Sequence, residues 1–281
     1  MEGPTMNRTK QYRQFVRTSE MVWERELIRY YRNRIRIVTG LSQPLLYLFV
    51  LGYGMGNLVG TTGGFDFKKF VFPGVVAMSV VSTAIFSAIS IVWDREFGFL
   101  REMLVAPVRR SAIVTGKIAG GATVSTAQGT IMLVFAPLIG VRLTVVLVLE
   151  VLAIEFVMAL SLTALGVFVA SRIDKMEGFQ VVMQLILLPM IFLSGATFPL
   201  AGLPGWLTVM TRVNPLTYAV APLRAVIFNA QNMPAIAVAR FPTTVELFGH
   251  TLSIWSDLGI VAIFLVLFFA LAVRGFSRTS K

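Results

Sequence analysis

The acidic side chains with the most unusual placement lie inside an apolar run. Glu150 and Glu155 are five residues apart within residues 143–170. At 3.6 residues per turn, this spacing puts them about 140° apart around a helix, so they do not share a face. The chain has a single histidine, His250, and no cysteine. The residues needed for a carboxylate acid/base pair, a thiol site or a histidine/cysteine metal site are therefore not available together.

A phosphate-binding loop is also missing from the sequence. Such a loop needs the pattern G-x-x-x-x-G-K-[ST], in which backbone N–H groups and the lysine hold the phosphates. The chain's only Gly-Lys pair is Gly116-Lys117, which is followed by Ile118 and has Ser111 at the first glycine position. We therefore expect no catalytic, cofactor-binding or metal-binding residues here, and we expect any ATP hydrolysis to take place on a separate polypeptide.

The two glutamates allow several non-catalytic roles. Ionisable groups at membrane depth are costly and usually face protein or water. Glu150 is near one end of its apolar run, where its carboxylate can reach the lipid headgroups. Glu155 is deeper, and three roles stay open for it: attraction of a cationic substrate, pairing with a basic group, or a structural hydrogen bond.

Composition assigns the chain to the integral membrane proteins. Of 281 residues, 56% are hydrophobic and 14% are charged, whereas soluble domains carry about 25% charged residues. The net charge is +11, but the basic residues lie between apolar runs and do not cluster on one soluble face, so nucleic acid is not an expected partner. Residues 1–35 are charged and lack the apolar core of a cleavable signal peptide.

Six apolar runs are long enough to be membrane spans, since a helix needs about 20 residues to cross the hydrocarbon core. The predicted spans are residues 37–55, 70–92, 112–140, 143–170, 179–198 and 252–273. One set of flanking segments holds 19 Lys and Arg residues and the other set holds six. The richer side is the cytoplasmic one, so we expect a multi-pass protein of a bacterial plasma membrane with both termini in the cytoplasm.

Small residues recur every four positions in two of these spans. The stripes are Ser79, Thr83 and Ser87 in the second span, and Ala112, Gly116 and Gly120 in the third. Small residues at this spacing allow helix backbones to approach closely within a membrane. We therefore expect packed helices, not separate anchors.

Two segments on the cytoplasmic side have amphipathic patterns. Residues 12–35 place aromatic and aliphatic groups on one side of a helix, which either lies in the membrane interface or only anchors the topology. In the loop 93–111, Asp94 to Glu96 start a segment that Gly98 interrupts, apolar residues then recur at helical spacing, and Pro107 ends it. Its apolar side needs a cover, either another part of the chain or a soluble partner.

The fifth span is followed by a broken apolar segment. The chain bends at Pro199 and Pro204 and then continues as two short apolar helix candidates, neither long enough to span. Interrupted backbone near a membrane is tolerated where protein or a water-lined cavity satisfies it. The segment 199–251 is therefore predicted to cap a pathway.

Two motifs at these places resemble one known family. They are Asp94-Arg-Glu-x-Gly98-x-x-Arg101-Glu102-x-Leu104-x-x-Pro107 and Phe198-Pro-Leu-x-x-Leu-Pro-x-Trp206-Leu, the latter continued by Asn214-Pro-Leu-x-Tyr218 and Arg224. Together they are similar to ABC-2 permeases of ATP-binding-cassette exporters, most of all the daunorubicin-resistance-type drug permeases. Phe99 departs from the pattern, because many relatives have threonine after the loop glycine.

The resemblance implies an all-α fold with an amphipathic connecting helix in residues 1–36, a six-helix domain in 37–273 and a cytoplasmic tail in 274–281. It also implies a homodimer or a heterodimer with a sister permease, on ABC ATPase subunits that bind ATP and magnesium. The expected ATPase-coupling residues are Asp94, Arg95, Glu96, Phe97, Gly98, Arg101, Glu102 and Pro107. The expected exit motif of the re-entrant helices is Pro199, Pro204, Trp206, Asn214, Pro215, Tyr218 and Arg224.

The substrate pathway is the least defined of these expectations. By resemblance, the second and fifth spans line it, and the predicted lining or gate residues are Phe86, Glu155, Gln184, Leu193 and Phe198. Gln43, Gln128, Met183 and Phe192 are further amide, Met and aromatic groups in or near spans. The expected cargo is an amphipathic drug, an antibiotic or a lipid-like compound, with a lipid-linked glycan or polysaccharide as an alternative. A scaffold that contacts an ATPase without transport is the rival from a different class.

Overall fold

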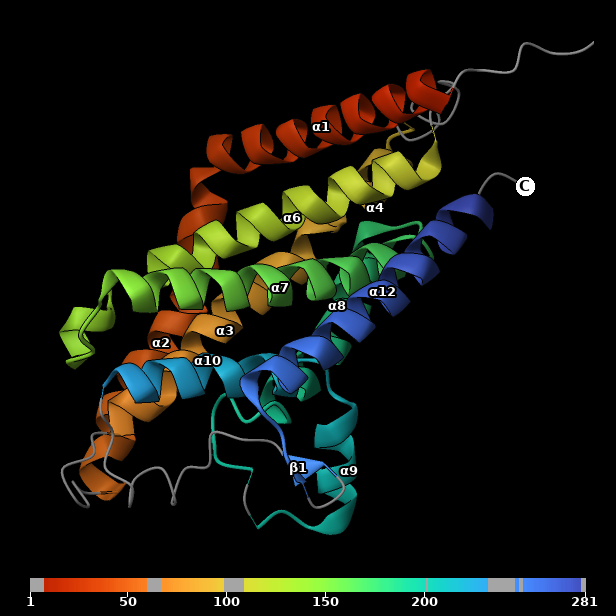
Figure 1. Cartoon of the computed structure of the whole chain (residues 1–281). Helices are drawn as coiled ribbons and strands as arrows, with labels where there is room; N and C mark the ends of the chain where they lie inside the picture. The colour runs from red at the N-terminus through yellow and green to blue at the C-terminus, as the bar shows by residue number, and fades with distance from the viewer. Residues whose placement is uncertain are drawn as a thin grey trace, which may run out of the picture.

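The protein is a bundle of long helices (Figure 1). The computed structural model describes residues 8–59, 67–98, 109–200, 202–231, 246–247 and 250–278. The helices in these ranges are α1 Arg8–Arg32, α2 Arg34–Val59, α3 Phe67–Ser87, α4 Ile89–Glu96, α6 Arg110–Leu133, α7 Val145–Ala170, α8 Met176–Phe192, α9 Gly205–Val213, α10 Thr217–Ala230 and α12 Ile254–Arg278, with a short 3-10 helix η2 Ala136–Ile139. Two-residue strands β1 Glu246–Leu247 and β2 His250–Thr251 pair antiparallel. The predicted all-α fold is confirmed.

The predicted spans differ in how well they meet the length and hydropathy of a membrane helix. Among the described residues, four helical segments meet both: Arg34–Gly54, Phe67–Glu96, Val145–Ala170 and Ile254–Phe276. The helix α8 is apolar but has only 17 residues. The helix α6 has 24 residues, and its many glycine, serine and threonine residues lower its hydropathy.

Two predicted spans end earlier than expected. The fifth was predicted to reach Phe198, but α8 ends at Phe192, because Gly195 takes a left-handed conformation with φ of 76° in the turn that follows. The third was predicted to reach Gly140, but α6 ends at Leu133, and Pro137 then lies in the 3-10 helix. In the second span, a break at Ala88 separates α3 from α4.

The helix α3 forms the centre of the bundle. It contacts α2, α6, α7, α8 and α10, and nearly all of its side chains are buried. Close approach depends on small residues. A Cβ atom on Gly166 of α7 would lie 2.7 Å from the backbone oxygen of Ile85, and one on Gly121 of α6 would overlap the Ser87 hydroxyl. The predicted packing role of the serine/threonine stripe is confirmed at Ser87.

The amphipathic helix α1 lies lengthwise along α6 (Figure 1). A Cβ atom on Gly116 would lie 2.6 Å from the Ser19 backbone oxygen, and one on Gly120 would lie 2.8 Å from the Glu26 Cβ. The indole N–H of Trp23 donates to Thr123 Oγ1 at 3.1 Å. The glycine stripe of α6 therefore receives α1, a partner that the sequence pattern did not identify.

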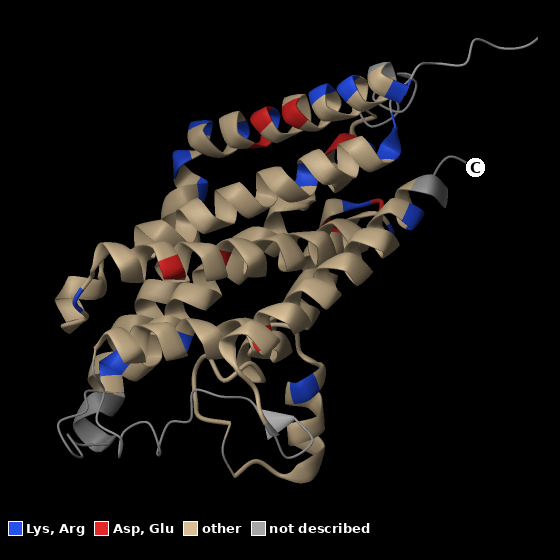
Figure 2. Ribbon diagram, viewed as in Figure 1, with Lys and Arg blue, Asp and Glu red and all other residues tan. Residues whose placement is uncertain are grey.

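Several helix ends meet at one end of the bundle, which we call the charged end. Arg110 at the start of α6 donates to the Phe276 backbone oxygen of α12 at 3.2 Å. Arg95 at the end of α4 donates to the Ser171 backbone oxygen after α7 at 3.2 Å. Lys and Arg residues, blue in Figure 2, lie along α1 and at this end. The opposite end, with α9 and the strand pair, we call the broken end.

Candidate functional site

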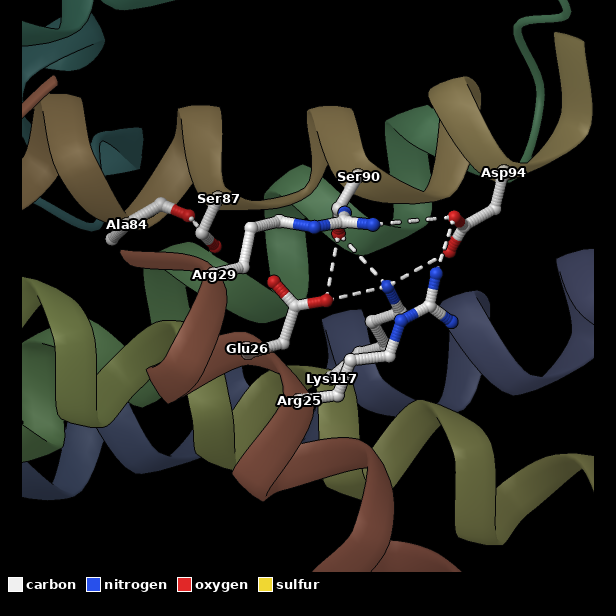
Figure 3. Close-up of polar contacts among 8 residues, drawn as sticks. All are labelled: Arg25, Glu26, Arg29, Ala84, Ser87, Ser90, Asp94 and Lys117. Atoms are coloured by element: carbon white, nitrogen blue, oxygen red, sulfur yellow. Dashed lines mark hydrogen bonds and ion pairs between the residues drawn. The ribbon is translucent and has the colours of Figure 1, made fainter. Parts of the chain in front are cut away.

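A cluster of buried charges lies on the charged-end side, where α1, α4 and α6 meet (Figure 3). We call it the charge cluster; its members are Arg25, Glu26 and Arg29 of α1, Ser90 and Asp94 of α4, and Lys117 of α6. The residues Glu26, Asp94 and Lys117 are only 5%, 1% and 4% exposed. Charged groups at this degree of burial require paired partners.

Lys117 is the hub of the cluster. Its Nζ atom lies 2.6 Å from Glu26 Oε1 and 3.3 Å from Asp94 Oδ2, and it donates to Ser90 Oγ at 2.9 Å. The Ser90 hydroxyl in turn donates to Glu26 Oε1 at 3.1 Å. Each of the three ammonium protons therefore has an acceptor, and the acceptors come from two other helices.

The second oxygen of Asp94 faces arginines of α1. Arg25 Nη2 lies 2.9 Å and Arg29 Nη2 lies 3.5 Å from Asp94 Oδ1. Both arginines are partly exposed, whereas Asp94 is enclosed. Asp94 thus links α4 to α1 through one oxygen and to α6 through the other. The three helices are held together by charge as well as by packing.

Some of the predicted coupling residues contact their own chain, and others lie at the surface. Asp94 was expected at the ATPase contact, but its carboxylate is enclosed by its own chain and is not available at the surface. Arg95 donates to the Ile173 backbone oxygen at 2.9 Å and pairs with Asp174 at 3.1 Å, and Glu96 accepts from the Met176 backbone N–H at 3.0 Å. These three residues fix α4 to its neighbours.

The exposed part of this motif begins just after them. Phe97 is 57% exposed, and Gly98 has a φ of 83°, a left-handed conformation that favours glycine. The remaining predicted coupling residues, Arg101, Glu102 and Pro107, lie outside the described residues.

Sequence reasoning did not identify Lys117 and Glu26 as site residues. A signal was present, because Lys117 stands inside a predicted span, and an ionisable group there calls for a partner. The partner was not readable from the pattern. Glu26 is one of several charges on α1, and only the close approach at Gly120 selects it.

A second feature is a cavity of about 470 Å³ lined by residues of α2, α3 and α8 and by Tyr30 of α1. We call it the α2–α3–α8 groove. It brings together two predicted pathway residues, Phe86 and Gln184, with Gln43 and Phe192. The other polar lining groups include Tyr30, Arg36, Tyr47 and Gln180, and the apolar ones include Met78, Leu188 and Ile191.

Three predicted pathway residues do not line this groove: Glu155, Leu193 and Phe198. Glu155 is fully buried, and within the described ranges neither carboxylate oxygen has a hydrogen-bond partner. It lies against Gly129 of α6, where an added Cβ would be 2.7 Å from Glu155 Oε1. Its predicted pairing with a basic group or a hydrogen-bond donor is thus not seen in the described part of the chain. Glu150 is exposed, as expected.

The link between groove and charge cluster is α1. Tyr30 lines the groove, and its hydroxyl donates to Gln128 Oε1 of α6. Burial raises the pKa of Tyr30, so the phenol keeps its proton for this bond. Glu26 lies four residues earlier on the same helix, one turn away. One face of α1 therefore contributes to both features.

The broken end is held by side chains of the predicted exit motif. Asn214 Nδ2 donates to the Met190 backbone oxygen at 2.7 Å, and Tyr218 Oη donates to the Arg212 backbone oxygen at 2.7 Å. Arg224 donates to the Gly195 backbone oxygen and lies 4.3 Å from the ring centroid of Phe70. The motif thus satisfies carbonyl groups that the interrupted helices leave free.

The two predicted short helices after the fifth span are α9 and α10. The helix α10 is buried from Thr217 to Phe228 and packs against α3, α7 and α12, so it re-enters the bundle. The helix α9 starts after Pro204 and lies at the surface, where Trp206 is 67% exposed. Pro199 and Pro215 lie in the connections on either side.

Comparison with known proteins places this architecture. Residues 19–228 match the family described as ABC-2 type transporter. Nodulation protein J of Rhizobium leguminosarum bv. trifolii is 31% identical over 74% of this chain and 80% of its own length. The putative transport permease ycf38 of Cyanophora paradoxa is 27% identical over 75% and 74%, and the inner membrane transport permease YadH of Escherichia coli K12 is 28% identical over 76% and 84%. With this match over most of its length, the chain belongs to the ABC-2 type transporter family, as a multi-pass permease.

Proposed function

We propose that this chain is the membrane subunit of an exporter that moves amphipathic compounds, and that a separate ABC ATPase drives it. The observation that carries this proposal is the position of α1. Glu26 of α1 belongs to the charge cluster beside α4, and Tyr30, one turn later on α1, lines the α2–α3–α8 groove. A displacement of α4 by an ATPase would therefore reach the wall of the groove through a rigid helix.

The charge cluster supports a coupling role for the segment around α4. Asp94 precedes the exposed Phe97 by three residues, and its carboxylate joins α4 to both α1 and α6. Breaking a buried ion pair is costly. We expect α1, α4 and α6 to move as one unit when the loop 93–111 is pushed or pulled.

The broken end supports an exit. Its connections are held by single hydrogen bonds from Asn214, Tyr218 and Arg224 to backbone oxygens. We assign this end to the outer side of the membrane, because Lys and Arg residues lie along α1 and at the charged end (Figure 2) and the side richer in basic residues is the cytoplasmic one. The complete transporter would contain two permease chains, identical or related, above two ATPase subunits.

The groove chemistry also favours a second cargo, a lipid-linked glycan. Gln43, Gln180 and Gln184 offer amide donors and acceptors that match sugar hydroxyl groups. Aromatic and aliphatic side chains beside them suit a lipid carrier. Drug-like and glycan-like cargoes differ in size and hydroxyl content, so transport assays can separate them.

The test is reconstitution of the chain with its cognate ABC ATPase in vesicles. We expect ATP-dependent movement of fluorescent amphipathic compounds across the bilayer, and no movement when the ATPase carries a substitution that abolishes hydrolysis. If the chain stimulates ATP hydrolysis but moves neither amphiphiles nor lipid-linked glycans, the export function is wrong and a scaffold role takes its place.

A further inference from the structure

The charged group that lines the α2–α3–α8 groove is positive, among the described residues. Within the described residues, Arg36 is the only charged side chain that lines it, and no carboxylate does. The Arg36 Nη2 atom is buried and has no hydrogen-bond partner in the described ranges. The charge of Glu26 acts on Arg36, but the Glu26 Oε1 atom is already held by Lys117 and Ser90. A buried guanidinium N–H without a partner, on a residue that lines a cavity, calls for an acceptor, most favourably an anionic one.

Three amide side chains line the same cavity as this cation. Gln43, Gln180 and Gln184 are exposed and line the same cavity from α2 and α8. Each carries two N–H donors and a carbonyl acceptor. Polar side chains in spans rarely face lipid, because lipid offers them no partners. Their convergence on one groove suits a ligand with several hydrogen-bonding groups.

The groove is polar at one end and apolar at the other. Arg36 and Gln180 lie near the starts of α2 and α8, on the side of the groove toward the charged end. Ile191 and Phe192 lie at the end of α8, and Met78 lies in the middle of α3. The cavity therefore offers a charge and hydrogen-bonding groups at the end toward the charged end, and an apolar wall at the opposite end.

We propose that the α2–α3–α8 groove binds an anionic amphiphile. The phosphate or carboxylate headgroup is held by Arg36 and by glutamines of the groove, and the acyl chain lies against Met78, Ile191 and Phe192. The volume of about 470 Å³ falls in the range of about 300–1,000 Å³ of small-molecule sites. That the bound molecule is cargo rests on the proposed export function. Among the described lining residues no carboxylate is present to attract a cationic amphiphile, and Glu155 lies outside the groove.

The test is a binding measurement on the full-length chain in neutral detergent, by native mass spectrometry. The probes are oleoyl lysophosphatidic acid, oleoyl lysophosphatidylcholine, which has the same chain and no net charge, and glycerol 3-phosphate, which has the headgroup alone. We expect the chain to retain lysophosphatidic acid on the order of tenfold better than lysophosphatidylcholine. Glycerol 3-phosphate should not displace it, because the apolar wall contributes to binding.

Matched variants locate the site. Arg36→Gln should reduce retention of lysophosphatidic acid on the order of tenfold. Arg34 lies two residues before Arg36, is exposed and does not line the groove. The Arg34→Gln variant removes the same charge as Arg36→Gln and should leave retention of lysophosphatidic acid unchanged. Equal losses in the two variants would mean general attraction to a basic surface and would overturn the proposal.

The comparison of probes on the unaltered chain decides the proposal even if Arg36→Gln does not fold. Equal retention of the two lysolipids would rule out an anion-selective groove. Displacement by glycerol 3-phosphate would reduce the site to one for a small anion. The assay contains no ATPase and no ATP. Binding without transport in vesicles would therefore contradict export alone, whereas transport without selective binding would contradict this inference alone.

Discussion

The charged end and the broken end satisfy their buried polar groups in different ways. At the charged end, Glu26, Asp94 and Lys117 pair with one another across three helices. At the broken end, Asn214 and Tyr218 instead bond to backbone oxygens of interrupted segments. A buried pair that loses one partner costs about 3–5 kcal/mol, whereas a typical hydrogen bond contributes about 1 kcal/mol. The first arrangement suits transmission of force, and the second suits local rearrangement.

The largest expected effect is at the hub of the charge cluster. Lys117→Met should lower the free energy of unfolding by about 3–5 kcal/mol, because Glu26 and Asp94 then face each other without the shared cation. Chemical denaturation of the purified chain in detergent measures this. Lys175→Met, at an exposed position before α8, is the matched control and should change little. Comparable stability of the two variants would remove the basis for treating the cluster as a structural link.

A backbone contact near the broken end should give the next largest effect. A Cβ atom on Gly74 of α3 would overlap the Ala196 backbone oxygen in the turn after α8. Gly74→Ala should therefore lower the free energy of unfolding by about 3 kcal/mol, since the backbone must shift to make room. Gly259→Ala in α12, where nothing lies within 4 Å, should be neutral or stabilising. A stable Gly74→Ala variant would show that the turn is not pressed against α3.

The smallest of the three effects should come from a single hydrogen bond of the exit motif. Asn214→Ala frees the Met190 backbone oxygen and should cost about 1–2 kcal/mol of unfolding free energy. In reconstituted vesicles, the same variant should change the transport rate while ATP binding persists. Thr208→Ala removes a bond at an exposed part of α9 and should change neither quantity. Loss of expression instead of altered transport would assign Asn214 a purely structural role.

Local patterns of the sequence predicted the elements of this fold well. The apolar runs predicted the long helices, four of which meet the length and hydropathy of a span among the described residues. The prolines after Phe198 predicted the break and the helices α9 and α10. Helix ends were less accurate, because Gly195 ends the fifth helix through a backbone conformation that hydropathy does not register.

Long-range pairing was beyond the sequence pattern. Glu26 and Lys117 are 91 residues apart, and no periodicity says that Gly120 lets α1 approach α6. The same limit applies to the predicted pathway residues. Phe86 and Gln184 do line the groove, but Glu155, which was chosen for its charge alone, faces Gly129 in the core. Residue type indicates which groups need partners, and packing alone decides which partners they receive.

The central claim is that α1 and α6 move as one unit while the broken end rearranges. The chain has no native cysteine, so pairs of spin labels can be placed without background. One pair joins exposed positions of α1 and α6, Glu20→Cys with Ala127→Cys, and the other joins Trp206→Cys of α9 with Val145→Cys of α7. Distances are measured by pulsed electron paramagnetic resonance in the ATPase complex, with and without ATP. We expect an unchanged α1–α6 distance and a changed α9–α7 distance. An ATP-dependent change between α1 and α6 with a fixed broken end would contradict the claim.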